Sequence, residues 1–192
     1  MICSDEHRYH RQLGLVDQDA VGSMRVSLGG DTNIVLATLS QLVCAGVGSG
    51  ADGIICIRTV GDSEIGAPRH AWVFSQKGEM KTWNDLGKAI EESHGITLKF
   101  GTVADGIHLE CVRGGKPDYS AADLYATVWH GQAVLSKSPL TFNQPPNISP
   151  SMLDASLEIA LGAAVVHRLF AIKGVIRAEP LSDLWLTLTG RA

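Results

Sequence analysis

The stretch from Arg25 to Val60 limits the folds open to this chain more than any other feature. A short extended run ends at Gly29-Gly30, apolar residues then recur at helical spacing, and residues 54–57 form an all-apolar run rich in isoleucine. An uninterrupted apolar run of this kind is typical of a buried parallel strand. The stretch predicts a strand–turn–helix–strand unit, whose first turn commonly holds a nucleotide phosphate at the helix N-terminus.

The turn of this unit carries side chains where a dinucleotide-binding turn has glycines. It reads Gly29-Gly30-Asp31-Thr32-Asn33, whereas a G-x-G-x-x-G turn needs glycines beyond the opening pair so that backbone N–H groups can approach a phosphate. The Asp31 carboxylate would lie near the positive end of the helix, where an anionic ligand belongs. Two interpretations stay open: phosphate binding by this turn, or a structural helix capped by Asp31, Thr32 or Asn33.

Length and charge limit the class of protein. The 192 residues fit one domain, and 45% of them are hydrophobic. A formal net charge of −4 argues against nucleic acid or an anionic membrane as the main partner. The polar start, residues 1–12, does not resemble a signal peptide, and no apolar run has the length of a membrane span, so we expect a cytoplasmic location.

We expect one domain over residues 1–192. Its predicted parts are an N-terminal helical arm (1–23), a Rossmann-like core (24–135), a crossover loop (136–150), and a C-terminal helix and strand (151–192). Because strand–helix–strand connections are right-handed and apolar strands need cover, we predict an α/β fold with a Rossmann-like, three-layer, mostly parallel sheet and helices on both faces. Between residues 96 and 119, alternating residues broken by glycines predict a short hairpin or strand pair.

The cysteines and histidines predict no metal site. Cys3, Cys44, Cys56 and Cys111 are widely spaced, which indicates neither a disulfide framework nor a structural zinc site. The seven histidines show no metal-ligand spacing. Cys3 and Cys111 remain open as reactive thiols.

The order of several motifs resembles a known family. The sequence RYHRQLGL, which begins at Arg8, is followed by a spacer, a strand, a glycine turn, a helix ending in AGVG and a second strand. This order resembles the ThiF/MoeB/HesA family, the bacterial relatives of ubiquitin-activating enzymes, most clearly from Arg8 to Lys81 and again from Met152 to Leu169. The resemblance implies ATP- and Mg²⁺-dependent adenylation of a carboxylate, commonly the C-terminal glycine of a ubiquitin-like sulfur carrier, and a dimer.

The resemblance carries family roles onto particular residues. The N-terminal motif places two arginines, Arg8 and Arg11, at the ATP phosphates, one of them typically across a dimer interface. Only the opening glycines of the family's turn, Gly29 and Gly30, are retained. Arg58 stands where the family has an acidic residue that accepts the ribose hydroxyl protons, and a guanidinium cannot accept them.

Three further positions follow from the same resemblance. Arg69 matches the arginine of the family's Asn-x-x-Arg signature, although the asparagine is replaced by Gly66. Lys81 matches a phosphate-binding lysine, and a solvated lysine in the first helical turn is the other interpretation. His130 occupies the segment where the family has a Mg²⁺-binding aspartate, and a neutral imidazole is a poor Mg²⁺ ligand. His130 follows a predicted central strand, where α/β sites form, but the pattern favours a partly buried, hydrogen-bonded histidine over a site residue.

By this resemblance, the sequence retains the cations that contact phosphates in the family and lacks the residues that form its nucleotide pocket. In relatives with two subunits, this pattern is that of the non-catalytic half. We therefore expect a degenerate family member that pairs with itself or with an active member and contributes Arg8 or Arg11 in trans.

Two alternatives remain open. One is an active adenylyltransferase with a rebuilt ATP site, acting on a small-molecule or carrier carboxylate. Its metal ligands would come from Asp62, Glu64, Asp105 and Asp118. The other is a peptide-binding clamp of a modification system, formed by a sheet edge and the loop around Pro145-Pro146.

Overall fold

The fold is that of a computed structural model of the 192-residue chain. The structure describes residues 16–66, 70, 80–101, 105–114, 117–129, 131–140 and 152–175. The predicted N-terminal arm up to residue 15, most of the predicted crossover loop and the predicted final strand lie outside the described residues.

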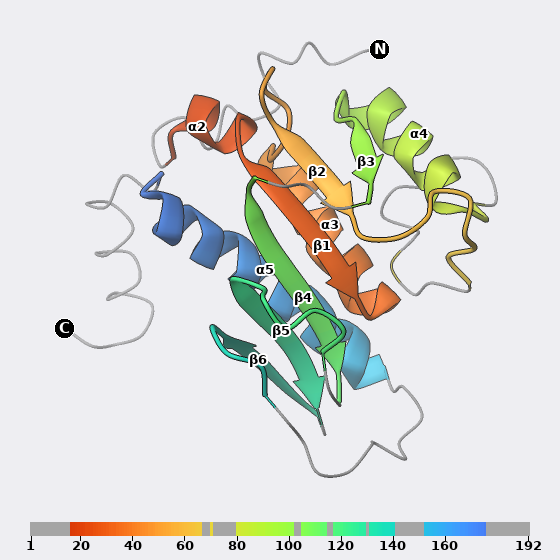
Figure 1. Cartoon of the computed structure of the whole chain (residues 1–192), viewed down its shortest axis with the longest axis vertical. Helices are drawn as coiled ribbons and strands as arrows, with labels where there is room; N and C mark the ends of the chain where they lie inside the picture. The colour runs from red at the N-terminus through yellow and green to blue at the C-terminus, as the bar shows by residue number, and fades with distance from the viewer. Residues whose placement is uncertain are drawn as a thin grey trace.

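A six-stranded sheet forms the centre of the fold, in the order β3-β2-β1-β4-β5-β6 (Figure 1). The strands are β1 (Arg25–Gly30), β2 (Ile54–Ile57), β3 (Leu98–Phe100), β4 (Ile107–Arg113), β5 (Leu124–Trp129) and β6 (Gln132–Ser136). The first five strands are parallel, and β6 pairs with β5 in the antiparallel direction. This mostly parallel sheet confirms the predicted Rossmann-like α/β class.

Four helices accompany the sheet in the described part of the chain. They are α2 (Gln18–Gly22), α3 (Thr32–Ala45), α4 (Trp83–His94) and α5 (Met152–Lys173). In Figure 1, α3 and α5 lie side by side behind the sheet. They approach closely at Gly162, where an added Cβ would come within 2.9 Å of the Ala37 carbonyl oxygen.

The described helices that pack on the sheet lie on one face of it. Helices α3 and α4 connect strands in the same direction, from β1 to β2 and from β2 to β3, so right-handed crossovers place both on the same face. The connections after β3 and β4 span only 101–106 and 114–123, which is too short for a helical crossover. The second layer of helices that the sequence predicts is therefore not found among the described residues.

The register gives the two faces different chemistry. On the helix-covered face, Val26 of β1 stands beside Ile55 of β2 and Leu28 stands beside Ile57, and all four are buried. On the opposite face, Ser27 stands beside Cys56, and Glu110 of β4 projects from the same side as Ser27 because its neighbour in the register is Gly29. The front face is therefore polar although it is largely buried.

Local signals begin and end the helices. Asp31 caps α3, and Gly46 ends it with a φ of 85°, a left-handed conformation that suits glycine. Thr82 and Asp85 form a reciprocal capping box at the start of α4. The prediction that a polar residue of the turn caps a structural helix is thus confirmed for Asp31.

Helix α5 differs from the expectation that no apolar run has the length of a membrane span. Among the described helices, its residues 154–173 are long and apolar enough, by length and composition, to cross a membrane. Its Leu161, Val165 and Leu169 are buried in the same hydrophobic core as α3. A core helix packed in this way has the same composition as a membrane span, so its apolar character has a structural explanation here.

Candidate functional site

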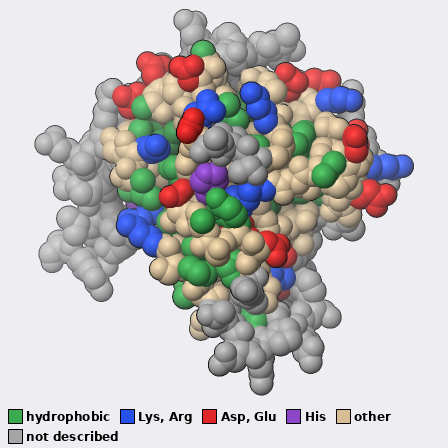
Figure 2. Space-filling model, in the orientation of Figure 1, with side chains coloured by type: hydrophobic (Ala, Val, Ile, Leu, Met, Phe, Trp, Pro, Cys, Tyr) green, Lys and Arg blue, Asp and Glu red, His purple; other side chains and the backbone are tan. Residues whose placement is uncertain are grey.

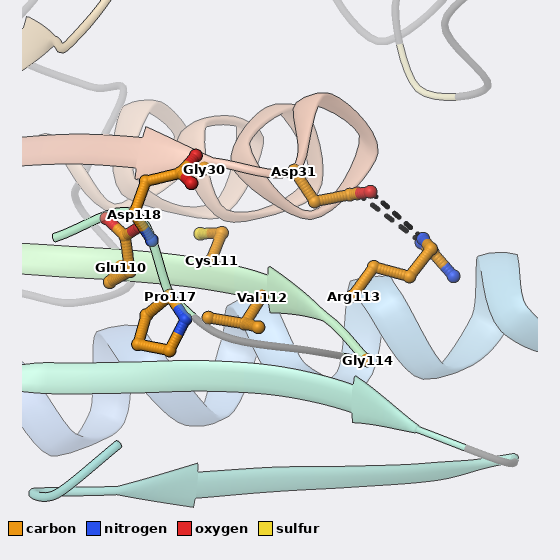
Figure 3. A pocket seen from close by; sticks show the side chains of 9 residues that line it. All are labelled: Gly30, Asp31, Glu110, Cys111, Val112, Arg113, Gly114, Pro117 and Asp118. Carbon is orange, nitrogen blue, oxygen red and sulfur yellow. Dashed lines mark hydrogen bonds and ion pairs between the residues drawn. The ribbon is translucent and has the colours of Figure 1, made fainter. Parts of the chain in front are cut away.

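The order of strands reverses between β1 and β4, and in open parallel sheets ligands bind outside the carboxyl ends of the strands at this point. A hollow of about 190 Å³ lies there, and its walls include Gly30, Asp31, Arg113 and Asp118. Figure 3 shows Arg113 reaching towards Asp31 on one side, with Glu110 and Asp118 near the end of β1 on the other. This hollow is the candidate site.

Neighbouring groups approach both glycines of the turn closely, and at Gly30 the neighbour is backbone. Gly30 has a φ of 98°, and a Cβ there would lie 1.9 Å from the carbonyl oxygen of Cys111. A Cβ on Gly29 would lie 2.6 Å from the Nε of Arg58. The next residue, Asp31, donates its N–H to the Cys111 carbonyl at 2.8 Å. The turn therefore packs directly on β4 on one side and on a guanidinium on the other.

Arg58 lies across the end of β1 on the front face. Its Nη2 donates to the Leu109 carbonyl at 2.9 Å and to the carboxylate of Glu110, and its Nη1 donates to the Ser27 carbonyl at 3.4 Å. Its guanidinium carbon lies 4.7 Å from the centre of the Tyr119 ring, a cation–π distance. The side chain is only 11% exposed. Arg58 therefore fills the space beside Gly29, and its guanidinium contacts other groups of the protein.

Glu110 holds the loop that follows β4 against this face. Its side chain is 2% exposed, and both carboxylate oxygens have partners. One oxygen accepts the N–H groups of Asp118 at 3.0 Å and Tyr119 at 3.1 Å, and the other accepts from Arg58. A buried ion pair of this kind is tolerable only when the remaining lone pairs are also satisfied, as they are here.

The N-terminus of α3 is satisfied by the chain's own carboxylate. Oδ1 of Asp31 accepts the N–H of Ile34 at 3.1 Å, and Oδ2 accepts from the Nε of Arg113 at 3.0 Å. A phosphate at this helix end would need the same N–H groups and the same positive potential. Asp31 therefore competes with a phosphate of ATP for this helix end.

Arg113 joins three acidic side chains in a partly buried cluster behind β4. Besides Asp31, it pairs with Glu158 and, at 3.7 Å, with Asp154, both from α5. Glu158 also bonds the Nε2 of His70 at 2.6 Å. Burial by itself would lower the pKa of Arg113, but the hydrogen bonds and charges of Asp31 and Glu158 outweigh it and raise that pKa above its ordinary value. The cluster ties β4, α3 and α5 together.

The structure brings some of the predicted site residues together. Gly29, Gly30, Asp31 and Arg58 all lie at the carboxyl ends of β1 and β2. Lys81 precedes α4, is exposed, and is not in the wall of the hollow. Its N–H donates to Asp85 at 3.2 Å. The other predicted residues, Arg8, Arg11, Arg69 and His130, lie outside the described residues.

Sequence reasoning missed Glu110, Arg113 and Glu158. A signal for Glu110 existed, because a carboxylate inside the apolar strand 107–113 needs a buried cation. Arg58, which directly follows the second strand of the βαβ unit, is such a cation. No comparable signal links Arg113 to Glu158, since they are 45 residues apart.

Two kinds of chemistry can be assessed near the hollow: the reactivity of the Cys111 thiol in its wall and metal binding. Burial is the main cause that raises the pKa of the Cys111 thiol far above its ordinary value, which disfavours the open possibility of a reactive Cys111. Among the described residues, no group of three or more His, Cys, Asp or Glu side chains could hold a metal ion.

Comparisons with known proteins add no relative. No protein-family model matches the chain, and no curated protein matches it. The resemblance to the ThiF/MoeB family therefore rests on the motifs alone.

Proposed function

We propose that this chain is a degenerate ThiF/MoeB-like protein that holds no ATP at its Rossmann turn. It acts as a non-catalytic or trans-acting partner in the ATP-dependent activation of a carboxylate, on a ubiquitin-like sulfur carrier or a small-molecule precursor. The observation that carries the proposal is the position of Arg58, whose guanidinium lies against Gly29 and is paired with Glu110.

The charges at the turn support the same conclusion. ATP would bring phosphates to the end of α3, where Asp31 already caps the helix and pairs with Arg113. A phosphate would have to displace the Asp31 carboxylate and would leave Arg113 to rearrange among Asp154 and Glu158. Such a displacement would break the partly buried, hydrogen-bonded ion pair between Arg113 and Asp31 and leave Arg113 near two other carboxylates.

The trans-acting role is supported by the N-terminal motif. Arg8 and Arg11 match the family's phosphate-contacting arginines, one of which typically reaches across a dimer interface. The partner that receives the arginine is a second copy of this chain or an active family member.

One observation favours the alternative of an active adenylyltransferase with a rebuilt site. Asp118, one of the carboxylates available as a metal ligand, lies in the wall of the hollow at the end of β4 and is exposed. Asp62, by contrast, accepts a hydrogen bond from Asn84 at 2.6 Å. Asp118 is therefore the carboxylate through which that alternative can be tested.

The first test is calorimetric titration of the full chain with Mg-ATP. We expect no saturable binding at micromolar ATP, because the Asp31 carboxylate already caps α3 and Arg58 fills the space beside Gly29. Micromolar binding that is lost in Asp118→Asn would overturn the proposal and support the rebuilt site. Lys137→Gln, at an exposed position after β6, is the control for a general effect of charge.

The second test concerns the arginine in trans. The protein and any partner would be cross-linked and co-purified from native cell extract, and adenylation by the complex would be followed by ATP–pyrophosphate exchange. Arg8→Ala is expected to lower the exchange rate while leaving the unfolding temperature of the chain nearly unchanged. An unchanged exchange rate in the reconstituted complex would contradict the trans-acting role.

A further inference from the structure

A second hollow lies at the opposite end of the sheet from the candidate site. It has a volume of about 380 Å³ and is bordered by the amino ends of β1 and β2, by β3, and by the glycine-rich loop 48–53. Arg25 and Lys99 are the two cations in its wall. The volume falls within the range of about 300–1,000 Å³ that is usual for small-molecule sites.

The register places both cations on the same face. Arg25 stands beside Ile54, and Cys56, two residues after Ile54, stands beside Lys99. Because side chains alternate along a strand, Arg25, Ile54 and Lys99 all project from the front face. Strands β1 and β3 are separated by β2 and hence lie about 10 Å apart, a span that two long side chains can bridge around one small ligand. Figure 2 shows basic side chains on this face near the amino ends of the strands, with acidic side chains beside them.

Neither cation is neutralised within the part of the chain that the structure describes. The Nε of Arg25 donates to the Asp105 carbonyl at 3.4 Å, but its terminal nitrogens have no acceptor there. No described carboxylate pairs with Lys99, which is exposed. A guanidinium fork and a neighbouring ammonium are the combination that proteins use to hold phosphate oxygens.

The glycine-rich loop adds backbone donors to the same wall. Among the described residues, no hydrogen bond is made by the N–H groups of Gly48, Ala51 or Asp52, whereas Gly50 donates to the Gly22 carbonyl at 3.0 Å. Close packing on α2 holds this shape, because a Cβ on Gly50 would lie 3.0 Å from the carbonyl carbon of Gly22. The loop is fixed by α2 and leaves N–H groups free for a ligand.

One carboxylate, Asp52, also borders the hollow. Within the wall, two cations against one carboxylate leave a net positive charge, which favours an anion over a cation. Two further acidic residues lie next to the wall: Asp105, whose carbonyl accepts from Arg25, and Glu91, whose carboxylate accepts from Thr97. We propose that this hollow binds the phosphate group of a small metabolite between Arg25 and Lys99. The proposal does not depend on the function proposed for the opposite end of the sheet.

The test is a titration of the full chain with inorganic phosphate at constant ionic strength, followed through the amide NMR signals of Gly48 and Asp52. Saturable shifts are expected, and Lys99→Gln and Arg25→Gln should each weaken the affinity about three- to ten-fold. Asp52→Asn should strengthen it. Lys137→Gln, the matched exposed control, should leave it unchanged.

A second probe identifies the source of the phosphate. Ribose 5-phosphate should bind more tightly than inorganic phosphate if the rest of the hollow holds the organic part of a metabolite. Equal affinities would overturn the metabolite and leave a site for the free ion. Absence of saturable binding, or equal effects of Lys99→Gln and Lys137→Gln, would overturn the site itself.

A variant at the other end of the sheet separates this proposal from the proposed function. Asp31→Asn changes the charge of the Rossmann turn while keeping a residue that caps helices well, and it should leave phosphate affinity unchanged. Stronger phosphate binding by Asp31→Asn would place the anion at the turn, where the variant removes a competing carboxylate, and would contradict the assignment to Arg25 and Lys99.

Discussion

Replacement of Arg113 by methionine should strongly destabilise the fold. Arg113 pairs with Asp31, Asp154 and Glu158, and the Glu158 side chain is 0% exposed. Methionine keeps much of the volume of the arginine stem but removes the charge. The Glu158 carboxylate would then stay buried without the charge of Arg113, while His70 still lies 2.6 Å from it.

The expected magnitude follows from this geometry. Removing one partner of a buried ion pair typically costs about 3–5 kcal/mol, because the remaining charge cannot return to water. Arg113 is 20% exposed and His70 still contacts Glu158, so we expect the lower end, about 3 kcal/mol. For a domain of this size, each kcal/mol lowers the unfolding midpoint by about 2–4 °C, which gives a decrease of about 6–12 °C.

Thermal and urea unfolding of Arg113→Met would measure this effect. The matched control is Arg168→Met on α5, an exposed arginine with no ion pair among the described contacts. The control should change the free energy of unfolding by no more than about 0.5 kcal/mol.

A second substitution tests the reason for the loss. If Arg113→Met destabilises by leaving Glu158 charged and buried, then Glu158→Gln should cost much less, or even stabilise, when added to Arg113→Met than when made alone. Equal costs of Glu158→Gln in both backgrounds would refute the coupling between the two side chains, and so would a loss below about 1 kcal/mol in Arg113→Met.

Three further predictions concern other parts of the fold. Gly30→Ala should cost more than about 3 kcal/mol in urea unfolding, because of strain at positive φ and the clash with Cys111. The control Gly87→Ala makes only ordinary contacts and should stabilise the fold by about 0.5–1 kcal/mol. Similar free energies of unfolding for the two variants would contradict the turn geometry. In the native protein a maleimide should label the exposed Cys44 but not the buried Cys111, and peptide mass mapping distinguishes the two. The pKa of Asp85 is lowered, mainly by the hydrogen bond that it accepts from the Thr82 backbone. Its contribution to stability is therefore present above about pH 4 and lost as the pH falls below that value. Asp85→Asn should remove this part of the pH dependence.

Much of the local structure could be predicted from the sequence. The spacing of apolar residues, the cap at Asp31 and the stop at Gly46 are all contained in one short stretch, and α3 spans Thr32–Ala45 between them. The strands β1 and β2 were predicted from the same stretch, since helix caps and apolar periodicity depend on residues that are close in the chain.

Strand pairing was less predictable. The region between residues 96 and 119 predicts a hairpin or strand pair, but β3 and β4 are parallel and lie apart, with β2 and β1 between them. The short connection of 101–106 favours direct pairing when only neighbouring residues are considered. The observed order instead allows the apolar sides of all strands to share one core with α3 and α5.

The candidate site likewise combines features set by neighbouring residues with contacts between residues that are far apart in the chain. The sequence by itself determined the βαβ unit, its non-standard turn and the capping role open to Asp31, because these depend on residue types a few positions apart. Only the tertiary structure decided that Arg58 pairs with Glu110, and that His70 meets Glu158 across 88 residues of chain. Buried charges must find partners wherever the fold brings them, and no local pattern specifies which distant charge that will be.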